Sequence, residues 1–545
     1  GATVVRLSVL AAQRGWLAVA LVREGATIAA TEFAELLPSD QPQLVVASFP
    51  RPLGPDAKLD ALELRFHTAR TAVFVRQVAI QAESPSARAV AQGKARFFMM
   101  GGEERHGWLA SRERDLVGTV RAQPGARLLF SWAQTPSLRT PGGGGRLTVV
   151  ATHPDGGTSE QAIGLDAARA DATWRERALE LDFLEGVPEA GVEGSLRFSV
   201  DCQPGADPAC ATAVVPVAAG SPPPPPPVLP VTSATHRGDC IGAAARPAGV
   251  STPNLDRLAA RGVTFQDCFS ATNITNPSHI ALMTGTSPRD HGVRDNRTRL
   301  AEDAPTLAEC FRDLGYRTWA AVSLRHLRHG VSGLGQGFDR MAVPFLNDTR
   351  RAGDTLDVVE AWLAKPGPSA VFLWVHLFDA HAPYDPPAEH AAAYWPTDMD
   401  PRDPSLPDPG LPKSLLAAAQ LQGLRNLDYP LASYKGEVSY LDAELGRLFE
   451  RAPFDAGIVA FVADHGESFG EHRIYYGHSG LYPQTIHVPL ILAWPDGPRG
   501  LRRRDPVQQI DLSRTLLDLA GAEGVPFRGR SLVDRTGSPA TEAPG

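Results

Sequence analysis

Six consecutive prolines divide the chain into two regions with different sequence patterns. They lie in the segment 221–230, which reads SPPPPPPVLP. Each proline ring fixes φ and removes a backbone donor, so the run holds an extended conformation that neither a helix nor a sheet accommodates. The chain has 545 residues, and at about 150 residues per domain it needs more than one core. We therefore predict a linker over residues 217–230 between separately folded regions.

Upstream of the prolines, short segments of alternating apolar and polar residues recur between Gly- and Pro-rich turns. RLTVVATH (146–153) and SLRFSVD (195–201) are two of them. Period-two alternation is typical of antiparallel sandwiches, and the polar stretch 83–93 divides the region. The sequence therefore predicts one β-sandwich over residues 1–85 and a second over 94–216. Neither contains a cluster of His, Asp and Cys, which favours a binding-module or spacer role.

Downstream, helices alternate with apolar strands. A predicted helix over 254–261 precedes a strand at 263–265, and Pro305 is placed in the first turn of another helix that ends before Gly315. Three further runs are typical of the buried strands of a parallel sheet: 371–376, 457–462 and 488–494. We predict an α/β domain with a mostly parallel sheet over residues 228–545. In such sheets ligands bind beyond the carboxyl ends of the strands.

Charge and composition argue against several classes of function. Lys and Arg number 53 and Asp and Glu number 61, which gives a net charge of −8. No basic block stands out, so nucleic acid is not an expected partner. No stretch reaches the roughly 18 uncharged apolar residues that cross a bilayer, so we expect no transmembrane segment in this chain. Residue 1 is Gly rather than Met, which is consistent with removal of a leader.

The cysteines favour an exported protein. Cys202 and Cys210 bracket the short loop CQPGADPAC, a spacing that a hairpin closes as a disulfide, and disulfides persist in oxidising compartments. We therefore expect a periplasmic, cell-surface or secreted location. Cys240, Cys268 and Cys310 stand singly, and we interpret them as buried free thiols.

Candidate site residues lie at the ends of predicted strands and at the start of one helix. Asp464 and His465 follow the run 457–462, and His381 follows 371–376. A carboxylate beside an imidazole suits a divalent metal ion, although each short motif also fits a capping Asp and a hydrogen-bonded loop His. Thr275 stands where a helix begins, and helix N-termini favour anions. Its hydroxyl is either a helix cap or a nucleophile.

The region from about 228 to 532 resembles the sulfatase branch of the alkaline phosphatase superfamily. The resemblance rests on many blocks in family order: STPNLDRLAARGVTF, TNPSHIALMTGTSPRDHGV, FLWVHLFDAHAPYDPP, ADHGESFGEH, VPLILAW and IDLSRTLLDLAG. It implies the α/β fold of that family and an anionic ester as the substrate. The predicted sandwiches lie outside it.

Departures from the family pattern indicate which chemistry is expected. Sulfatases of this family carry Cys or Ser in a C/S-x-P-S-R signature and oxidise it to formylglycine, whereas this chain has Thr275 and His279 at the first and last positions. Threonine is a secondary alcohol and yields only a ketone. The chain therefore resembles the phosphoryl-transfer members, in which a threonine attacks phosphorus. This resemblance implies catalytic roles for Thr275, His279, His381 and His478, and one divalent ion (Mn, Mg, Ca or Zn) bound by Thr275, Asp464 and His465.

The first strand lacks the acidic residue that the family uses as a metal ligand. The family pattern has Asp where VLPVTSATHRGD has Ala234, and Pro230 interrupts the same strand. His236 or Asp239 could substitute for the missing ligand. One hypothesis is therefore a phosphodiester or phosphoester hydrolase or transferase whose metal site is weak or empty. The alternative is a catalytically inactive sulfatase-like domain that serves binding or assembly at the cell surface, with a glycan or another cell-envelope component as its partner.

Overall fold

The structure is a computed structural model. The described part is residues 226–533, with gaps at 345–347, 365–369, 412–420, 452 and 523–526, together with the strands of residues 3–217 and a few of their turns. Side chains before residue 102 are outside the described part.

A mixed, mostly parallel sheet forms the centre of the downstream domain. β17 (Val228–Ser233) lies between β21 (Val371–Leu377) and β22 (Ile458–Ala463) and is parallel to both. The strand order is β20-β19-β21-β17-β22-β25-β18-β26, which confirms the predicted α/β domain. The prediction that 488–494 is a parallel strand is wrong, because β25 (His487–Ala493) runs antiparallel to both of its neighbours. A buried apolar run looks the same in either direction.

The remaining downstream elements surround these strands. The other strands are β18 (Val263–Phe269), β19 (Arg317–Val322), β20 (Arg340–Ala342), β23 (Ser468–Phe469), β24 (Tyr475–Gly477), β26 (Leu501–Arg503) and β27 (Val507–Gln508). The longer helices are α2 (Pro253–Arg261), α3 (Thr275–Thr284), α5 (Leu307–Asp313), α7 (Ala352–Leu363), α10 (Asp428–Phe449) and α12 (Gln509–Leu519). Short helices are α4 (Pro288–His291), η3 (Arg325–Leu327), α6 (His329–Ser332), α8 (Ala388–Ala392), η5 (Phe454–Ala456), η6 (Glu471–Arg473) and α11 (Pro483–Ile486). None of the helices in the described part is long and apolar enough to cross a membrane.

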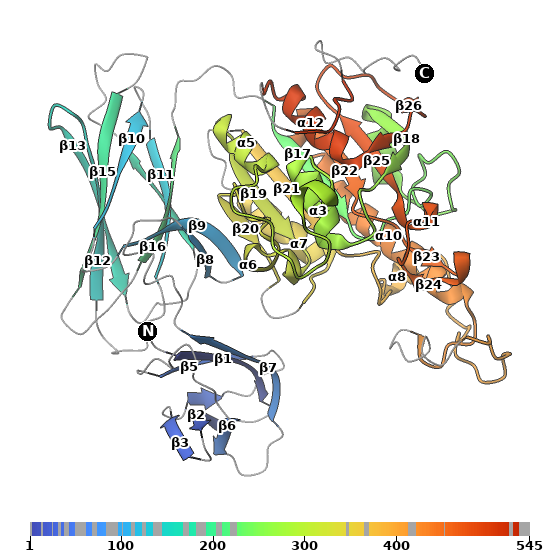
Figure 1. Cartoon of the computed structure of the whole chain (residues 1–545), viewed down its shortest axis with the longest axis horizontal. Helices are drawn as coiled ribbons and strands as arrows, with labels where there is room; N and C mark the ends of the chain where they lie inside the picture. Colours follow the sequence, from blue (N-terminus) through green and yellow to red (C-terminus); the bar gives the residue numbers. More distant parts are fainter. Residues whose placement is uncertain are drawn as a thin grey trace.

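Helices cover both faces of this sheet (Figure 1). On one face α3, α5 and α12 pack against side chains such as Phe372 and Trp374 of β21. On the other, α2, α7 and α10 pack against Leu373 and Val375 of the same strand. Successive side chains of a strand point to opposite faces, so one apolar strand supplies both cores. Because β17, β21 and β22 are parallel, their carboxyl ends meet at one edge of the sheet.

Helix boundaries follow the predicted signals with one correction. The prediction of a helix over 254–261 is confirmed within one residue by α2. Pro305 is not in the first turn of α5, because Thr306 caps that helix and its hydroxyl accepts a hydrogen bond from the Glu309 N–H. Gly285 ends α3 with a positive φ of 59°, and a Cβ there would lie 2.6 Å from the Phe527 ring, so both conformation and space favour glycine.

Pro230 occupies the central strand without displacing it. β17 keeps its register with β22 through Pro230, which lies opposite Ala460. The Ala234 N–H donates to the Leu377 oxygen of β21. Backbone N–H groups alternate in direction along a strand, so those of the even-numbered residues of β17 point toward β21. The proline therefore removes one hydrogen bond on the β21 side only. Ala234, where the resemblance predicts an acidic residue, therefore lies at the end of an intact strand.

The upstream region is rich in strands. Those before residue 103 are β1 (Thr3–Ala11), β2 (Gly15–Arg23), β3 (Ala26–Ala30), β4 (Ala34–Leu36), β5 (Gln43–Phe49), β6 (Ala61–His67), β7 (Val73–Ala82) and β8 (Arg96–Met100). Those after it are β9 (Glu103–Ala110), β10 (Leu116–Ala122), β11 (Arg127–Gln134), β12 (Gly144–Thr152), β13 (Thr158–Asp166), β14 (Arg175–Glu180), β15 (Val192–Cys202) and β16 (Cys210–Val217). Both sandwiches, and the boundaries 1–85, 94–216 and 217–230, remain predictions.

Within residues 103–217, side chains from two sets of strands share an apolar core. Phe130 of β11 meets Phe198 of β15 edge to face, with ring centroids 5.7 Å apart. One set has the order β10-β15-β12-β13, and the other contains β14-β11-β16-β9. The side chains of Cys202 and Cys210 lie outside the described residues, so their disulfide stays a prediction. Cys240 and Cys268 are free and buried as expected, and Cys310 is free but only half-buried.

Candidate functional site

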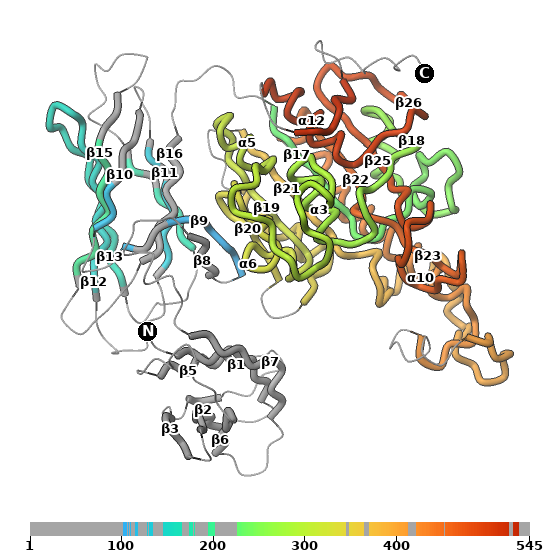
Figure 2. Tube along the Cα trace, in the orientation of Figure 1, coloured from blue at the N-terminus to red at the C-terminus, as the bar shows by residue number. Residues whose placement is uncertain are grey.

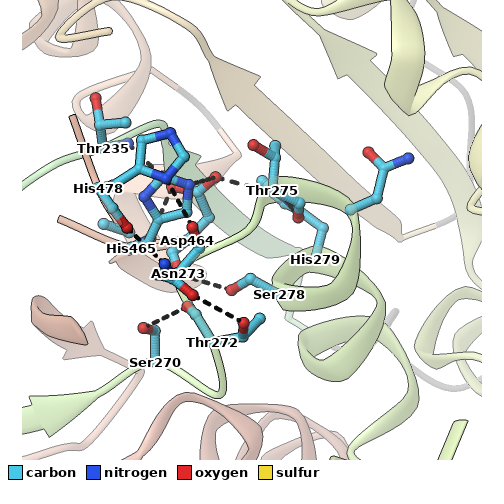
Figure 3. Close-up of polar contacts among 12 residues, drawn as sticks. Thr235, Ser270, Thr272, Asn273, Thr275, Ser278, His279, Asp464, His465 and His478 are labelled. Atoms are coloured by element: carbon cyan, nitrogen blue, oxygen red, sulfur yellow. Dashed lines mark hydrogen bonds and ion pairs between the residues drawn. The ribbon is translucent and has the colours of Figure 1, made fainter. Parts of the chain in front are cut away.

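The candidate site lies where α3 meets the carboxyl end of β22. Asp464 and His465 directly follow β22, and Thr275 is the first residue of α3. The Ser278 hydroxyl of α3 donates to the Asp464 backbone oxygen at 2.6 Å, which fixes the helix against the strand end. Figure 3 shows Thr275 grouped with Asp464, His465 and His478, with Ser278 and His279 on the same helix.

Asp464 presents one carboxylate oxygen without a partner. Its Oδ1 accepts hydrogen bonds from the N–H groups of Thr235 at 3.0 Å and His465 at 2.7 Å. Its Oδ2 has no hydrogen-bond partner among the described residues, and the side chain is fully buried. Burial raises the pKa of Asp464, while His279 and the two N–H groups oppose that rise. An unpaired buried carboxylate oxygen is costly and calls for a proton or a cation.

Three imidazoles beside Thr275 share one hydrogen-bonding pattern. Each directs Nδ1 to a backbone oxygen: His381 to Ala382 at 2.7 Å, His465 to Gly466 at 3.0 Å, and His478 to Asn273 at 2.8 Å. A carbonyl only accepts, so Nδ1 carries the hydrogen and Nε2 of the neutral ring offers a lone pair. Metal-binding and proton-accepting histidines are commonly held in this way.

The three rings lie close together. The centroids of His465 and His478 are 4.3 Å apart, and those of His381 and His478 are 6.1 Å apart. Burial lowers the pKa of His465 to about 3 and that of His381 to about 4. These two rings are therefore neutral at pH 7 in the free protein and act as acceptors until a ligand changes their surroundings.

His279 supports Thr275 from inside the fold. Its Nδ1 lies 2.8 Å from the Thr275 carbonyl oxygen, and its Nε2 lies 3.2 Å from Thr232 Oγ1. The same hydroxyl accepts from the Trp374 indole at 3.0 Å, so it donates its own hydrogen to His279. Burial lowers the pKa of His279. A neutral, fully buried ring with both nitrogens engaged fixes the first turn of α3.

The end of β17 supplies no metal ligand. Ala234 is buried and has only a methyl group. His236 bonds Ser233 Oγ at 3.1 Å and the Cys240 oxygen at 2.9 Å, so both of its nitrogens are engaged. Asp239 accepts from Arg237 Nε at 2.9 Å and Nη2 at 2.8 Å. Neither side chain is free to substitute for the missing carboxylate in this structure.

The residues present fit a divalent metal ion only in part. Asp464 Oδ2 and His465 Nε2 are buried, have no hydrogen-bond partner among the described residues, and lie 3.5 Å apart. An anionic oxygen and an imidazole nitrogen are suitable donors. Within the part of the chain that is described, however, no three His, Cys, Asp or Glu side chains are grouped to hold a metal ion. The donor types fit and their number falls short.

His326 belongs to the same surroundings and was not among the predicted site residues. It lies in η3, and its Nδ1 is 2.7 Å from Oδ1 of Asn276, the residue after Thr275. Burial and then the nearby His381 lower the pKa of His326 to about 4. η3 follows β19 much as His381 follows β21, so applying the strand-end rule to β19 would have identified it.

Comparison with known proteins connects the downstream domain to one family. The family model described as Sulfatase matches residues 240–522. The Delta 4,5-hexuronate-2-O-sulfatase of Bacteroides thetaiotaomicron is 27% identical over 319 residues, covering 52% of this chain and 65% of that protein. A multifunctional alkaline phosphatase superfamily protein of Trinickia caryophylli is 22% identical over 358 residues, covering 50% and 69%.

Coverage of these relatives is partial. The match spans 65% of the length of the sulfatases of Bacteroides thetaiotaomicron and Formosa agariphila. Among solved structures, the phosphonate monoester hydrolase of Agrobacterium radiobacter is 22% identical with a TM-score of 0.46, covering 56% of this chain and 76% of that one.

Proposed function

Because the chain belongs to the sulfatase family, we propose that it binds an anionic ester at the carboxyl edge of its α/β sheet with Thr275 as a phosphoryl-transfer nucleophile. The observation that carries the proposal is the pair of buried, unpartnered atoms, Asp464 Oδ2 and His465 Nε2, 3.5 Å apart beside α3. Threonine cannot become formylglycine, so a phosphate ester suits this site better than a sulfate ester.

The proposed roles follow from the hydrogen bonds. A divalent metal ion held by Asp464, His465 and Thr275 would lower the pKa of the Thr275 hydroxyl. His279 orients Thr275 through its carbonyl oxygen. His381 and His478 offer Nε2 atoms that can take the Thr275 proton and return it to the leaving alcohol, while the Thr275 oxygen forms its bond to phosphorus and the ester bond breaks.

A second candidate function is binding without turnover. It is favoured by Ala234, together with the engagement of His236 and Asp239 in the fold. A site left with Asp464, His465 and the Thr275 hydroxyl holds an ion weakly, since losing even a supporting contact typically reduces affinity by about 10- to 100-fold. In this case the domain would recognise an anionic glycan or cell-envelope ester, consistent with relatives whose names describe sulfatases of sugars.

Restoring the missing carboxylate distinguishes the two functions. We expect Ala234→Asp to raise Mn²⁺ or Zn²⁺ affinity at least about tenfold, measured by calorimetry, and to raise hydrolysis of bis-p-nitrophenyl phosphate in parallel. Ala234→Asn is the matched control, because it has the same shape without the charge. A rise in metal affinity without hydrolysis supports binding without turnover.

Equal metal affinity and equal rates in the native chain and Ala234→Asp would contradict the weakened site. They would show that another residue already supplies the fourth ligand, beside Asp464, His465 and Thr275. Hydrolysis of p-nitrocatechol sulfate in preference to the phosphate diester would contradict the phosphoryl proposal.

A further inference from the structure

β9 belongs to both halves of the chain. Its first residues pair antiparallel with β20, with Glu104 opposite Met341, and its last residues pair with β16, with Ala110 opposite Cys210. The Val343 N–H also donates to the Gly102 oxygen at 2.9 Å. Figure 2 shows β9 reaching from the upstream strands to β20 and α6. The upstream region therefore extends the central sheet of the downstream domain.

Two buried arginines and one half-buried carboxylate hold this junction together. The Glu176 carboxylate of β14 accepts from Arg105 of β9 and from Arg340 of β20, both at 3.2 Å. The Arg340 guanidinium lies 4.0 Å from the ring centroid of Trp319 and 4.4 Å from that of Trp362. One carboxylate thus binds an arginine from each half, and two rings cover one of them.

Glu104 reaches from β9 into the downstream domain. Its side chain is buried, and Oε2 accepts a hydrogen bond from the His329 backbone N–H at 2.9 Å. Burial raises the pKa of Glu104, whereas the His329 N–H, Arg328 and Arg299 lower it. Removing this carboxylate takes away the hydrogen bond that joins β9 to the backbone of residue 329.

The segment that Glu104 holds also carries His326. Residues 325–332 form η3 and α6, and the Ser332 hydroxyl donates to the Leu327 oxygen at 2.7 Å, which ties the two turns together. His326 Nδ1 donates to Asn276 Oδ1 at 2.7 Å. The Asn276 N–H in turn donates to Asn296 Oδ1 at 2.9 Å, so Asn276 is held in place. Two residues separate His326 from His329.

We propose that Glu104 is a positioning residue for the candidate site, which it serves by holding the 325–332 segment so that His326 meets Asn276 beside Thr275. The upstream region is then part of the site's framework rather than a spacer. This inference rests on the proposed function, because it takes the surroundings of Thr275 as the site.

The test compares two adjacent glutamates of β9. Glu104→Ala removes the acceptor for the His329 N–H, and Glu103→Ala is the matched control, because Glu103 pairs with Arg105 on the same strand and has no contact with residues 325–332 among those described. Protein with ¹⁵N-labelled histidine reports the hydrogen-bonded Nδ1–H of His326 by NMR, with His326→Gln to assign it. We expect this signal to shift or broaden in Glu104→Ala and to stay unchanged in Glu103→Ala and Glu104→Gln.

Inorganic phosphate binding provides the second readout. We expect Glu104→Ala to weaken phosphate about tenfold in the native background and to have no further effect when His326→Ala is already present. A His326 signal that is unchanged in Glu104→Ala would overturn the inference. So would a loss of phosphate affinity on Glu104→Ala that is equally large in the native and His326→Ala backgrounds. If Glu104→Ala does not fold, Glu104→Asp withdraws the oxygen by one methylene and is expected to give the same signal change.

The NMR readout does not depend on turnover. A native chain with no phosphatase activity and no phosphate affinity would contradict the proposed function, while a His326 signal that follows Glu104 would still support the structural coupling.

Discussion

The neighbouring strands β17 and β22 both end at the candidate site, but the polar side chains that follow them differ in their hydrogen bonding. After β22, Asp464 Oδ2 and His465 Nε2 have no hydrogen-bond partners among the described residues. After β17, the polar side chains of His236 and Asp239 are engaged by Ser233, Cys240 and Arg237, and Ala234 has only a methyl group. The β22 end has two atoms free to bind a ligand, whereas the polar side chains at the β17 end are used in hydrogen bonds within the fold.

The difference concerns what the hydrogen bonds at each strand end leave available to a ligand. Unpaired buried groups cost about 1–3 kcal/mol each, so a fold retains them where a ligand offsets the cost. Groups that bond one another stabilise the fold whether or not a ligand is present. The β22 end therefore keeps two atoms available to a ligand, whereas the polar side chains after β17 are engaged within the fold.

The largest expected effect concerns Thr275. In the Ala234→Asp background, Thr275→Ala should reduce phosphodiester hydrolysis at least about 1,000-fold, because the nucleophilic oxygen is gone. Thr275→Ser keeps a hydroxyl and should stay within about tenfold. The measurement is steady-state hydrolysis of bis-p-nitrophenyl phosphate with metal content checked in parallel. Undiminished hydrolysis by Thr275→Ala would assign the nucleophile elsewhere.

His236→Ala should destabilise the fold by about 3 kcal/mol, because it removes two hydrogen bonds and a buried ring that meets Phe461 edge to face at 5.4 Å. Denaturant unfolding measures this change. Metal affinity should stay within about twofold of the native chain. A tenfold fall in metal affinity with little loss of stability would make His236 the substitute ligand and would break the comparison.

The end of β21 provides a pH test. Burial raises the pKa of Asp379 from 3.8 to about 6, and its Oδ2 has no partner among the described residues. The folded state therefore holds this proton longer than the unfolded state. The protonated Asp379 carboxyl therefore adds up to about 3 kcal/mol to the unfolding free energy. This stabilisation is complete below about pH 3.8 and is lost as the pH rises through about 6.

Asp379→Asn should remove that pH dependence. Between pH 4 and pH 7 the native chain should lose up to about 3 kcal/mol of unfolding free energy relative to the variant. Exposed Asp385→Asn is the control and should follow the native chain. Parallel curves for the native chain and Asp379→Asn would show that the carboxyl is ionised in the fold.

The smallest effect is expected at Asp464. Asp464→Asn keeps the oxygen that accepts from Thr235 and His465 and replaces the unpaired oxygen with a neutral amide. In metal-free protein we expect a gain of about 1–2 kcal/mol in unfolding free energy, together with weaker metal binding. Destabilisation by Asp464→Asn would show that Oδ2 already has a partner in the protein.

Much of the site's location could be predicted because its signals are local. Apolar runs mark β21 and β22, and the rule that ligands bind beyond strand ends points to His381, Asp464 and His465. The helix start at Thr275 is visible from the residues that follow it. Their catalytic and metal-binding roles remain proposals.

Other features depend on contacts that a linear sequence does not display. The direction of β25 depends on how it pairs with its neighbours, so its apolar run does not predict that it is antiparallel. The suggestion that His236 replaces the acidic metal ligand rested on its position two residues after Ala234. The hydrogen bonds that engage His236 depend on the fold of the turn after β17, which the sequence does not display. The pairing of β9 with β20 joins residues more than two hundred positions apart, and β20 is only three residues long.

The shared β9 strand also changes where the chain can be cut. The prolines look like a natural boundary, yet a protein that begins after them would leave β20 as an exposed edge, and Arg340 would lose the Glu176 carboxylate that binds it. Open edges of this kind template pairing between molecules. Truncation at the prolines should therefore yield a self-associating domain, and the unit that unfolds cooperatively extends across them.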